Sequence, residues 1–166
     1  MNANEEPKMV DVHLSRIVIT EGADRQHIFL SEFNGTRGFP IVIGNNEAAE
    51  IDRVVKGQEF ERPMTHQLVH SVIESLAARL KRCDIIDLRK NTFFAQLVLQ
   101  SKTGDTIAVV DARPSDAIAL ALRARCGIRV AESVLEQVRT DKGPDTLPDP
   151  ESESGPESPE TPETEE

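Results

Sequence analysis

The residues best suited to chemistry lie in a six-residue segment that begins at Asp111 and ends at Asp116. The two carboxylates could hold a divalent cation or polarise a water molecule. Between them, Arg113 could grip a phosphate and Ser115 could contact the same anion. A structural alternative stands beside this interpretation, because a proline here opens a predicted helix. In that alternative Asp116 interacts favourably with the helix dipole, Ser115 caps the helix and Arg113 pairs with one of the aspartates.

Residues elsewhere in the chain could join this segment. Glu47, like Asp116, is the first-turn acid of a predicted helix that follows a strand, so the two could converge on one cleft. With Asp111 they would hold Mg²⁺ or Mn²⁺, and no organic cofactor is predicted. His66 would act as a general acid or base, or else be a packed imidazole. Arg62 is either a second phosphate contact or part of a surface turn.

The elements that position these residues follow from hydrophobic periodicity and from turn residues. Strands are predicted at 9–19, 27–33, 39–43, 84–88, 92–99, 106–111 and 128–130, and helices at 47–56, 65–80, 114–125 and 132–138. An asparagine is expected to cap the first helix and Thr65 the second, whose apolar face runs to Leu80. The order predicts an α+β domain with a mainly antiparallel sheet and helices packed on it. The strand-to-helix passages before Glu47 and Asp116 are alike, which raises an internal duplication as an alternative.

Composition divides the chain into a short lead (1–8), a folded domain (9–139) and a tail (140–166). The tail contains ten of the 29 acidic residues and one of the 19 basic ones, so it carries −9 of the net charge of −10. Such a Pro-rich, acidic stretch is predicted to be disordered. No apolar run is long enough to cross a membrane, and no secretory signal is visible at the start, so a cytoplasmic location is expected. The cysteines, Cys83 and Cys126, are expected to be small core residues.

Two groups of basic residues could contact phosphates or simply face solvent. They are Arg79, Lys81, Arg82, Arg89 and Lys90, and then Arg123, Arg125 and Arg129. The chain has no Trp or Tyr, which leaves little provision for stacking on bases. No glycine-rich phosphate loop and no nucleophile elbow occurs.

Four segments stand out by their residues and spacing: 39–44 with 47–49, 62–66, 92–95 with Leu97, and the most distinctive one, 111–123. Together they resemble the bifunctional nuclease domain family, over roughly residues 9–138. The resemblance implies an α+β fold, nuclease activity on DNA or RNA and a homo-oligomer, most simply a dimer. Glu47, His66, Asp111, Arg113, Ser115 and Asp116 match the family pattern.

Three functions therefore stand as hypotheses. The first is a divalent-metal-dependent nuclease, in which Glu47, Asp111 and Asp116 hold the metal, His66 moves protons and Arg113 clamps the phosphate. The second is a non-catalytic oligomeric module for regulation or scaffolding, in which the same residues fix helix starts and subunit contacts. The third is a nucleic-acid binder without hydrolysis.

Overall fold

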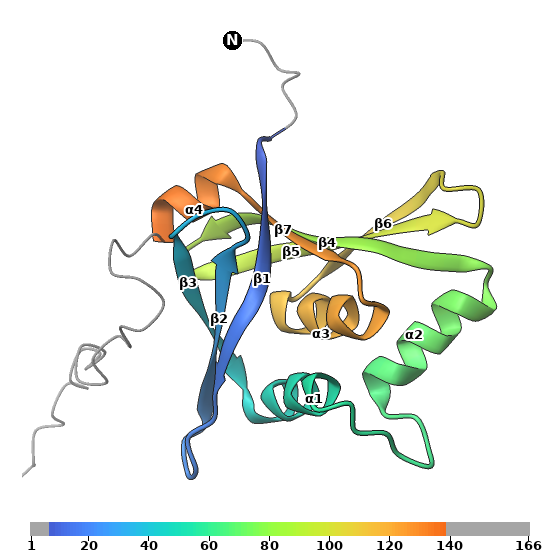
Figure 1. Ribbon diagram of the computed structural model, residues 1–166, viewed down its shortest axis with the longest axis horizontal. Helices are drawn as coiled ribbons and strands as arrows, with labels where there is room; N and C mark the ends of the chain where they lie inside the picture. Colours follow the sequence, from blue (N-terminus) through green and yellow to red (C-terminus); the bar gives the residue numbers. More distant parts are fainter. Residues whose placement is uncertain (1–6, 139–166) are drawn as a thin grey trace, which may run out of the picture.

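The computed structural model describes residues 7–138, which form a seven-stranded mixed sheet with four helices (Figure 1). The strands are β1 (Met9–Val18), β2 (Arg25–Glu32), β3 (Gly38–Gly44), β4 (Ala78–Arg89), β5 (Thr92–Ser101), β6 (Thr106–Ala112) and β7 (Gly127–Ala131). The helices are α1 (Asn45–Val55), α2 (Thr65–Ser75), α3 (Pro114–Ala124) and α4 (Glu132–Val138). The predicted α+β class is confirmed. The disordered tail that the sequence predicts lies outside the described residues.

The sheet has the order β3-β2-β1-β7-β4-β5-β6 and is mostly antiparallel. Its one parallel pair is β4 with β7, which joins the β1–β3 half of the sheet to the β4–β6 half. Both halves run three antiparallel strands into a helix, β1–β3 into α1 and β4–β6 into α3. This common order does not by itself show a duplication of the sequence. Pro40 lies in β3, which is an edge strand, as a missing backbone N–H requires.

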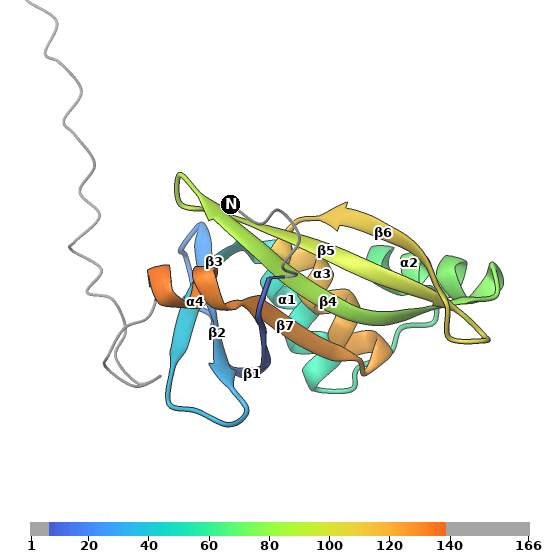
Figure 2. The same cartoon turned by 90° about the horizontal axis from the view of Figure 1, so that it is seen from above.

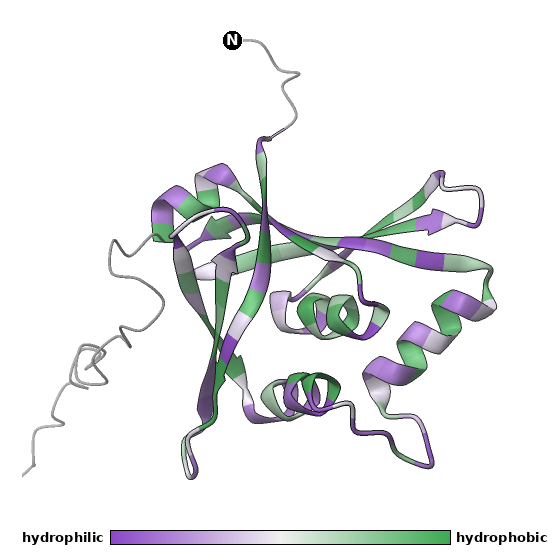
Figure 3. Ribbon diagram, viewed as in Figure 1, coloured by the Kyte–Doolittle hydropathy of each residue, from purple (hydrophilic) through white to green (hydrophobic). Residues whose placement is uncertain are grey.

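Helix α3 lies at the centre of the molecule and brings the candidate residues together. It packs on β4 and β5 on one side and on α1 and α2 on the other (Figures 1 and 2). Its Ala117, Ala119 and Ala121 are fully buried, and these small side chains let the neighbouring elements approach closely. Figure 3 accordingly shows α3 coloured mostly as hydrophobic. The helix is therefore covered both by the sheet and by α1 and α2.

The predicted helix caps and one predicted helix end are wrong. The residue before α1 is Gly44, without a side-chain cap, and Asn45 instead accepts a hydrogen bond from Gln26 Nε2 at 2.6 Å. Thr65 is the first residue of α2 and not its cap. Helix α2 ends at Ser75, because Ala77 turns left-handed (φ 57°) and the chain then enters the long strand β4. Leu80 therefore belongs to β4.

Several other boundaries follow the sequence. Proline opens α3 as predicted, and β7 and α4 lie where the sequence places them. Helix α3 ends at Ala124, where Arg125 adopts a left-handed conformation (φ 51°). Cys83 is fully buried and Cys126 packs against the core, as expected of small core residues. Within 7–138, no helix has the length and apolar character needed to cross a membrane.

Two buried acids account for several of the basic residues. Asp84 on β4 is 2% exposed and accepts paired hydrogen bonds from Arg82 and from Arg129 of β7 at 2.8–3.2 Å. Glu50 on α1, equally buried, binds Arg53 and Arg123. Three of the arginines that the sequence offers as phosphate contacts therefore hold the fold together.

Candidate functional site

The start of α3 places Arg113 beside Asp116. Arg113 is the extended residue directly before the helix, and Asp116 lies in its first turn. The guanidinium makes a two-pronged contact, with Nε donating to Asp116 Oδ2 at 2.7 Å and Nη2 to Oδ1 at 3.0 Å. Of the two aspartates that the sequence offered to this arginine, the structure selects Asp116. The pKa of Arg113 is raised chiefly by this hydrogen bond, so the guanidinium stays cationic.

Helix α2 adds a histidine to the same carboxylate. His66 Nε2 lies 3.0 Å from Asp116 Oδ1, although the two residues are fifty positions apart in the chain. Their side chains are only 16% and 27% exposed. Burial by itself raises the pKa of Asp116, but the hydrogen bonds from Arg113 and His66 outweigh it, and the pKa is lowered. Asp116 is therefore an ionised carboxylate that orients an imidazole.

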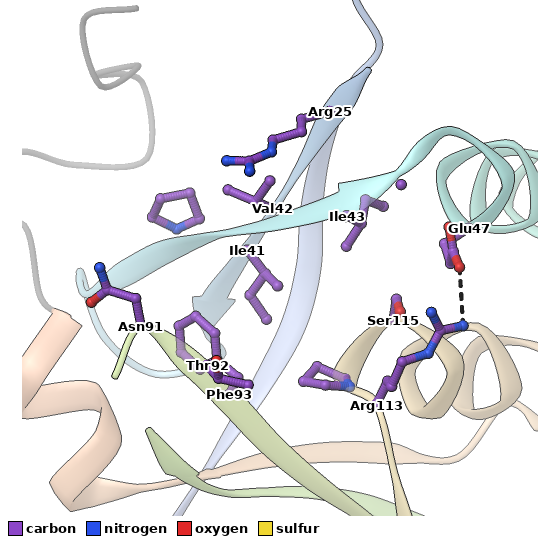
Figure 4. Close-up of a pocket in the computed structure, with 13 residues that line it drawn as sticks. Arg25, Ile41, Val42, Ile43, Glu47, Asn91, Thr92, Phe93, Arg113 and Ser115 are labelled. Carbon is purple, nitrogen blue, oxygen red and sulfur yellow. Dashed lines mark ion pairs between the residues drawn. The ribbon is translucent and has the colours of Figure 1, made fainter. Parts of the chain in front are cut away.

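Helix α1 supplies the second carboxylate. Glu47 Oε1 lies 3.0 Å from Arg113 Nη2 (Figure 4), so the arginine joins the first turns of α1 and α3. Gly44 makes room for this arrangement, since a Cβ atom at that position would lie 2.5 Å from Glu47 Oε2. The predicted convergence of the two helix-start acids thus takes place around a guanidinium.

These four side chains line a cavity of about 570 Å³ between α1, α2 and α3. Its apolar wall comes from Met64, Val69 and Leu120, and its polar residues include Arg53 and Glu50 as well as the four named above. An apolar hollow with a few converging polar groups is typical of small-molecule and catalytic sites. The cavity places an oriented histidine and an arginine at one accessible surface.

The remaining candidates lie apart from this cluster. Asp111 is an exposed residue of β6, opposite Gln96 of β5, and does not line the cavity. Arg62 is exposed in the loop before α2 and does not line it either. Ser115 is 8% exposed and faces a second cavity on the other side of Arg113. The structure therefore groups Glu47, His66, Arg113 and Asp116.

The expected metal site does not fit this arrangement. Glu47 and Asp116 both contact the guanidinium of Arg113, which holds the position that a shared cation would need, and Asp111 is not with them. Between residues 7 and 138, no three His, Cys, Asp or Glu side chains are grouped to hold a metal ion. We therefore derive no chemical step from bound Mg²⁺ or Mn²⁺.

Sequence reasoning found the four central residues but missed the way they connect. It treated Arg113 as a phosphate clamp or a local partner of one aspartate, not as a link between two helices. It also missed Arg53 and Glu50 as part of the cavity. One signal was available for Glu50, which shares a helix with Arg53 at a spacing of three residues.

The fold and the site define an α+β protein with an acid–histidine–arginine cluster held by three helices. The model of the family described as "Bifunctional nuclease domain" matches residues 28–142, and the chain belongs to that family. It is similar to two uncharacterized proteins of Mycobacterium tuberculosis, from two strains. Each is 40% identical over 129 residues, which is 78% of this chain and 76% of the relative.

Proposed function

We propose that this protein is a nuclease that hydrolyses phosphodiester bonds of DNA or RNA in the cavity lined by His66, Arg113 and Asp116. The observation that carries the proposal is the contact of His66 with a partly buried, ionised carboxylate beside a cationic arginine. Membership of the bifunctional nuclease domain family supports a role on nucleic acid.

The geometry assigns a task to each residue. Asp116 Oδ1 accepts the Nε2 proton of His66, which leaves Nδ1 as the basic nitrogen of the ring. Nδ1 takes a proton from water as the water oxygen bonds to phosphorus. The bond from phosphorus to the leaving ester oxygen then breaks, and the proton passes from His66 to that oxygen. Water is consumed, and one phosphate monoester and one hydroxyl group form.

Arg113 stabilises the charge on the phosphoryl oxygens. Its Nε and Nη2 atoms make the contacts with Asp116 and Glu47 that are described above, so the Nη1 donors point to other positions. A guanidinium in this position offers a fixed donor to the developing negative charge. Glu47 holds the arginine from the opposite side and acts as a positioning residue.

Replacement of His66 by glutamine tests the proposal. We expect hydrolysis of single-stranded DNA and RNA to fall about 100-fold or more, because proton transfer by a side chain contributes that much. His70→Gln is the matched control, since His70 lies one turn further along α2 and pairs with Glu74 outside the site. Initial rates on fluorescent oligonucleotides, measured with identically purified proteins, provide the comparison.

One result of that assay would contradict the proposal. Equal rates in wild type and in His66→Gln would identify a contaminating nuclease as the source of the activity.

The divalent-metal dependence and the cytoplasmic location that the sequence suggests stay predictions. For the metal, loss of activity in EDTA with recovery in Mg²⁺ or Mn²⁺ would establish the dependence.

A second candidate function, a non-catalytic oligomeric module, is favoured by exposed apolar side chains. On α2, at Leu76 directly after it and on the edge strand β6, at the same end of the molecule (Figure 1), large apolar residues are 39–74% exposed. They are Leu68, Val69, Val72, Leu76, Ile107, Val109 and Val110. Apolar surface gathered in this way is typical of protein–protein contacts.

We expect this surface to join two copies of the chain. Light scattering after size exclusion should give about twice the chain mass of 18.4 kDa for the wild type. The double variant Val72→Lys/Leu76→Lys should run as a monomer, because two ammonium groups cannot be buried unpaired. This variant leaves Leu68 and Val69 unchanged. A wild-type monomer at every concentration would contradict the expectation.

A further inference from the structure

A second cavity adjoins the first across the ion pair between Glu47 and Arg113. It has a volume of about 510 Å³ and lies between β3, the turn that joins β4 to β5, and the start of α3. Figure 4 shows that the residues that line this cavity come from these separate elements. Glu47 and Arg113 line both cavities, so their contact forms the partition between them. A phosphate bound to Arg113 would therefore border both spaces.

The walls of this second cavity are largely apolar. Val42 on the edge strand β3 is 46% exposed, although it is a large apolar residue, and Phe93 of β5 lines the same space. Phe93 is held in place by stacking on the buried ring of Phe39, with ring centroids 5.7 Å apart. Val42 and Phe93 thus bring apolar side chains to the cavity from two different strands, and such a lining suits a flat, apolar ligand.

Polar groups stand at the rim of the same cavity. Asn91 lies in a turn in which it and Lys90 both have positive φ (58° and 48°), a conformation that asparagine tolerates well. Its side-chain amide offers both hydrogen-bond donors and an acceptor. Arg113 lines the cavity as well, and its side chain is 66% exposed, so its guanidinium can be reached by an anionic group of a ligand.

We propose that this cavity takes the base of a nucleotide whose phosphate contacts Arg113. A nucleobase has flat apolar faces for Val42 and Phe93 and a polar edge for the amide of Asn91. The volume lies within the range of small-ligand sites. The assignment deepens the proposed function, because it uses the same arginine. It provides a base-binding position beside the phosphate that is attacked.

The test compares two ligands that differ only in the base. Adenosine 5′-monophosphate and ribose 5-phosphate carry the same sugar and phosphate, so the ratio of their dissociation constants reports contacts with the base. For the full-length wild type we expect the nucleotide to bind at least about tenfold more tightly, which is the typical effect of stacking one base. Isothermal calorimetry or ligand-detected NMR measures both constants.

A double variant removes the base contacts without touching Arg113. Val42→Ser takes away an apolar wall, and Asn91→Gly removes the amide while keeping a residue that accepts positive φ. The ratio should fall to within about threefold of one, with the affinity for ribose 5-phosphate unchanged. Val55→Ser is the control, because Val55 is similarly exposed and lines neither cavity. Circular dichroism and thermal midpoints verify that each variant is folded.

The outcomes are separable from those for hydrolysis. Equal affinity for the two ligands in the wild type, no measurable binding of the nucleotide, or an unchanged ratio in the double variant would overturn the base site. The binding assay involves no bond cleavage. A tenfold ratio that the double variant abolishes would therefore support the base site even if the protein hydrolysed nothing, and the nuclease proposal alone would then fail.

Discussion

Asp116→Asn is expected to lower phosphodiester hydrolysis about 100-fold or more while the protein stays folded. The carboxylate is the group through which the other residues of the site are held, since it accepts from His66 and twice from Arg113. An asparagine has one oxygen and one amide group in the same place. It cannot accept from both partners, so the imidazole loses its fixed orientation and its basic Nδ1.

The combination of Asp116→Asn with His66→Gln makes this expectation sharper. Residues that act as one unit give non-additive effects, so the double variant should be about as slow as the slower single variant. Asp52→Asn is the control, because Asp52 pairs with Lys56 on α1 and lines neither cavity. If the fold loss in rate of the double variant equalled the product of the two single losses, His66 and Asp116 would act independently, which would contradict the proposed cooperation between them.

The second large effect concerns stability and follows from Asp84. Asp84→Asn should lower the free energy of unfolding by about 3 kcal/mol, because it removes the charge of a buried carboxylate that pairs with two partly buried guanidinium groups. Arg82 and Arg129 both donate to this carboxylate, and Arg129 connects β4 to β7 across the parallel pair. Urea denaturation monitored by circular dichroism measures the change.

Asp87→Asn provides the matched control on the same strand. Asp87 binds Arg89 two residues further on, as Asp84 binds Arg82, but the side chains of that pair are 32% and 70% exposed. Exposed pairs contribute about 0–1 kcal/mol, so the control should unfold close to the wild type. Equal losses in the two variants would contradict the role given to burial.

The same carboxylate predicts the pH dependence of stability. Burial alone raises the pKa of Asp84, yet hydrogen bonds from Arg129 and Arg82 outweigh it and hold the pKa below the ordinary value. A group whose pKa is lower in the folded protein stabilises the fold above its unfolded pKa, which is about 3.9 for aspartate. That stability is lost as the pH falls through the folded value. Asp84→Asn should show a shallower loss in this acidic range.

Local signals sufficed for most of the elements. Alternating apolar residues and turn residues located all seven strands, because both signals lie within a few residues of each strand. The end of α2 was misplaced because Ala77 adopts a left-handed conformation for which its side chain gives no local signal. The position of β7 between β1 and β4 depends on contacts far apart in the chain, which periodicity does not encode.

The candidate site was predictable in part for a similar reason. Helix-start positions marked Glu47 and Asp116, since first-turn acids are read directly from the sequence. The sharing of Arg113 between them depends on how α1 packs against α3, and the sequence does not give that geometry. Likewise, nothing in the spacing of Arg82 and Arg129 shows that a buried aspartate lies between them.

The position of β7 in the sheet also affects how the chain folds during synthesis. This short strand fills the middle of the sheet, yet it follows every other strand in the sequence. Until the ribosome has released it, β1 and β4 both present open edges with unpaired backbone groups. The nascent protein is therefore exposed to edge-to-edge association until nearly all of its folded part has been made.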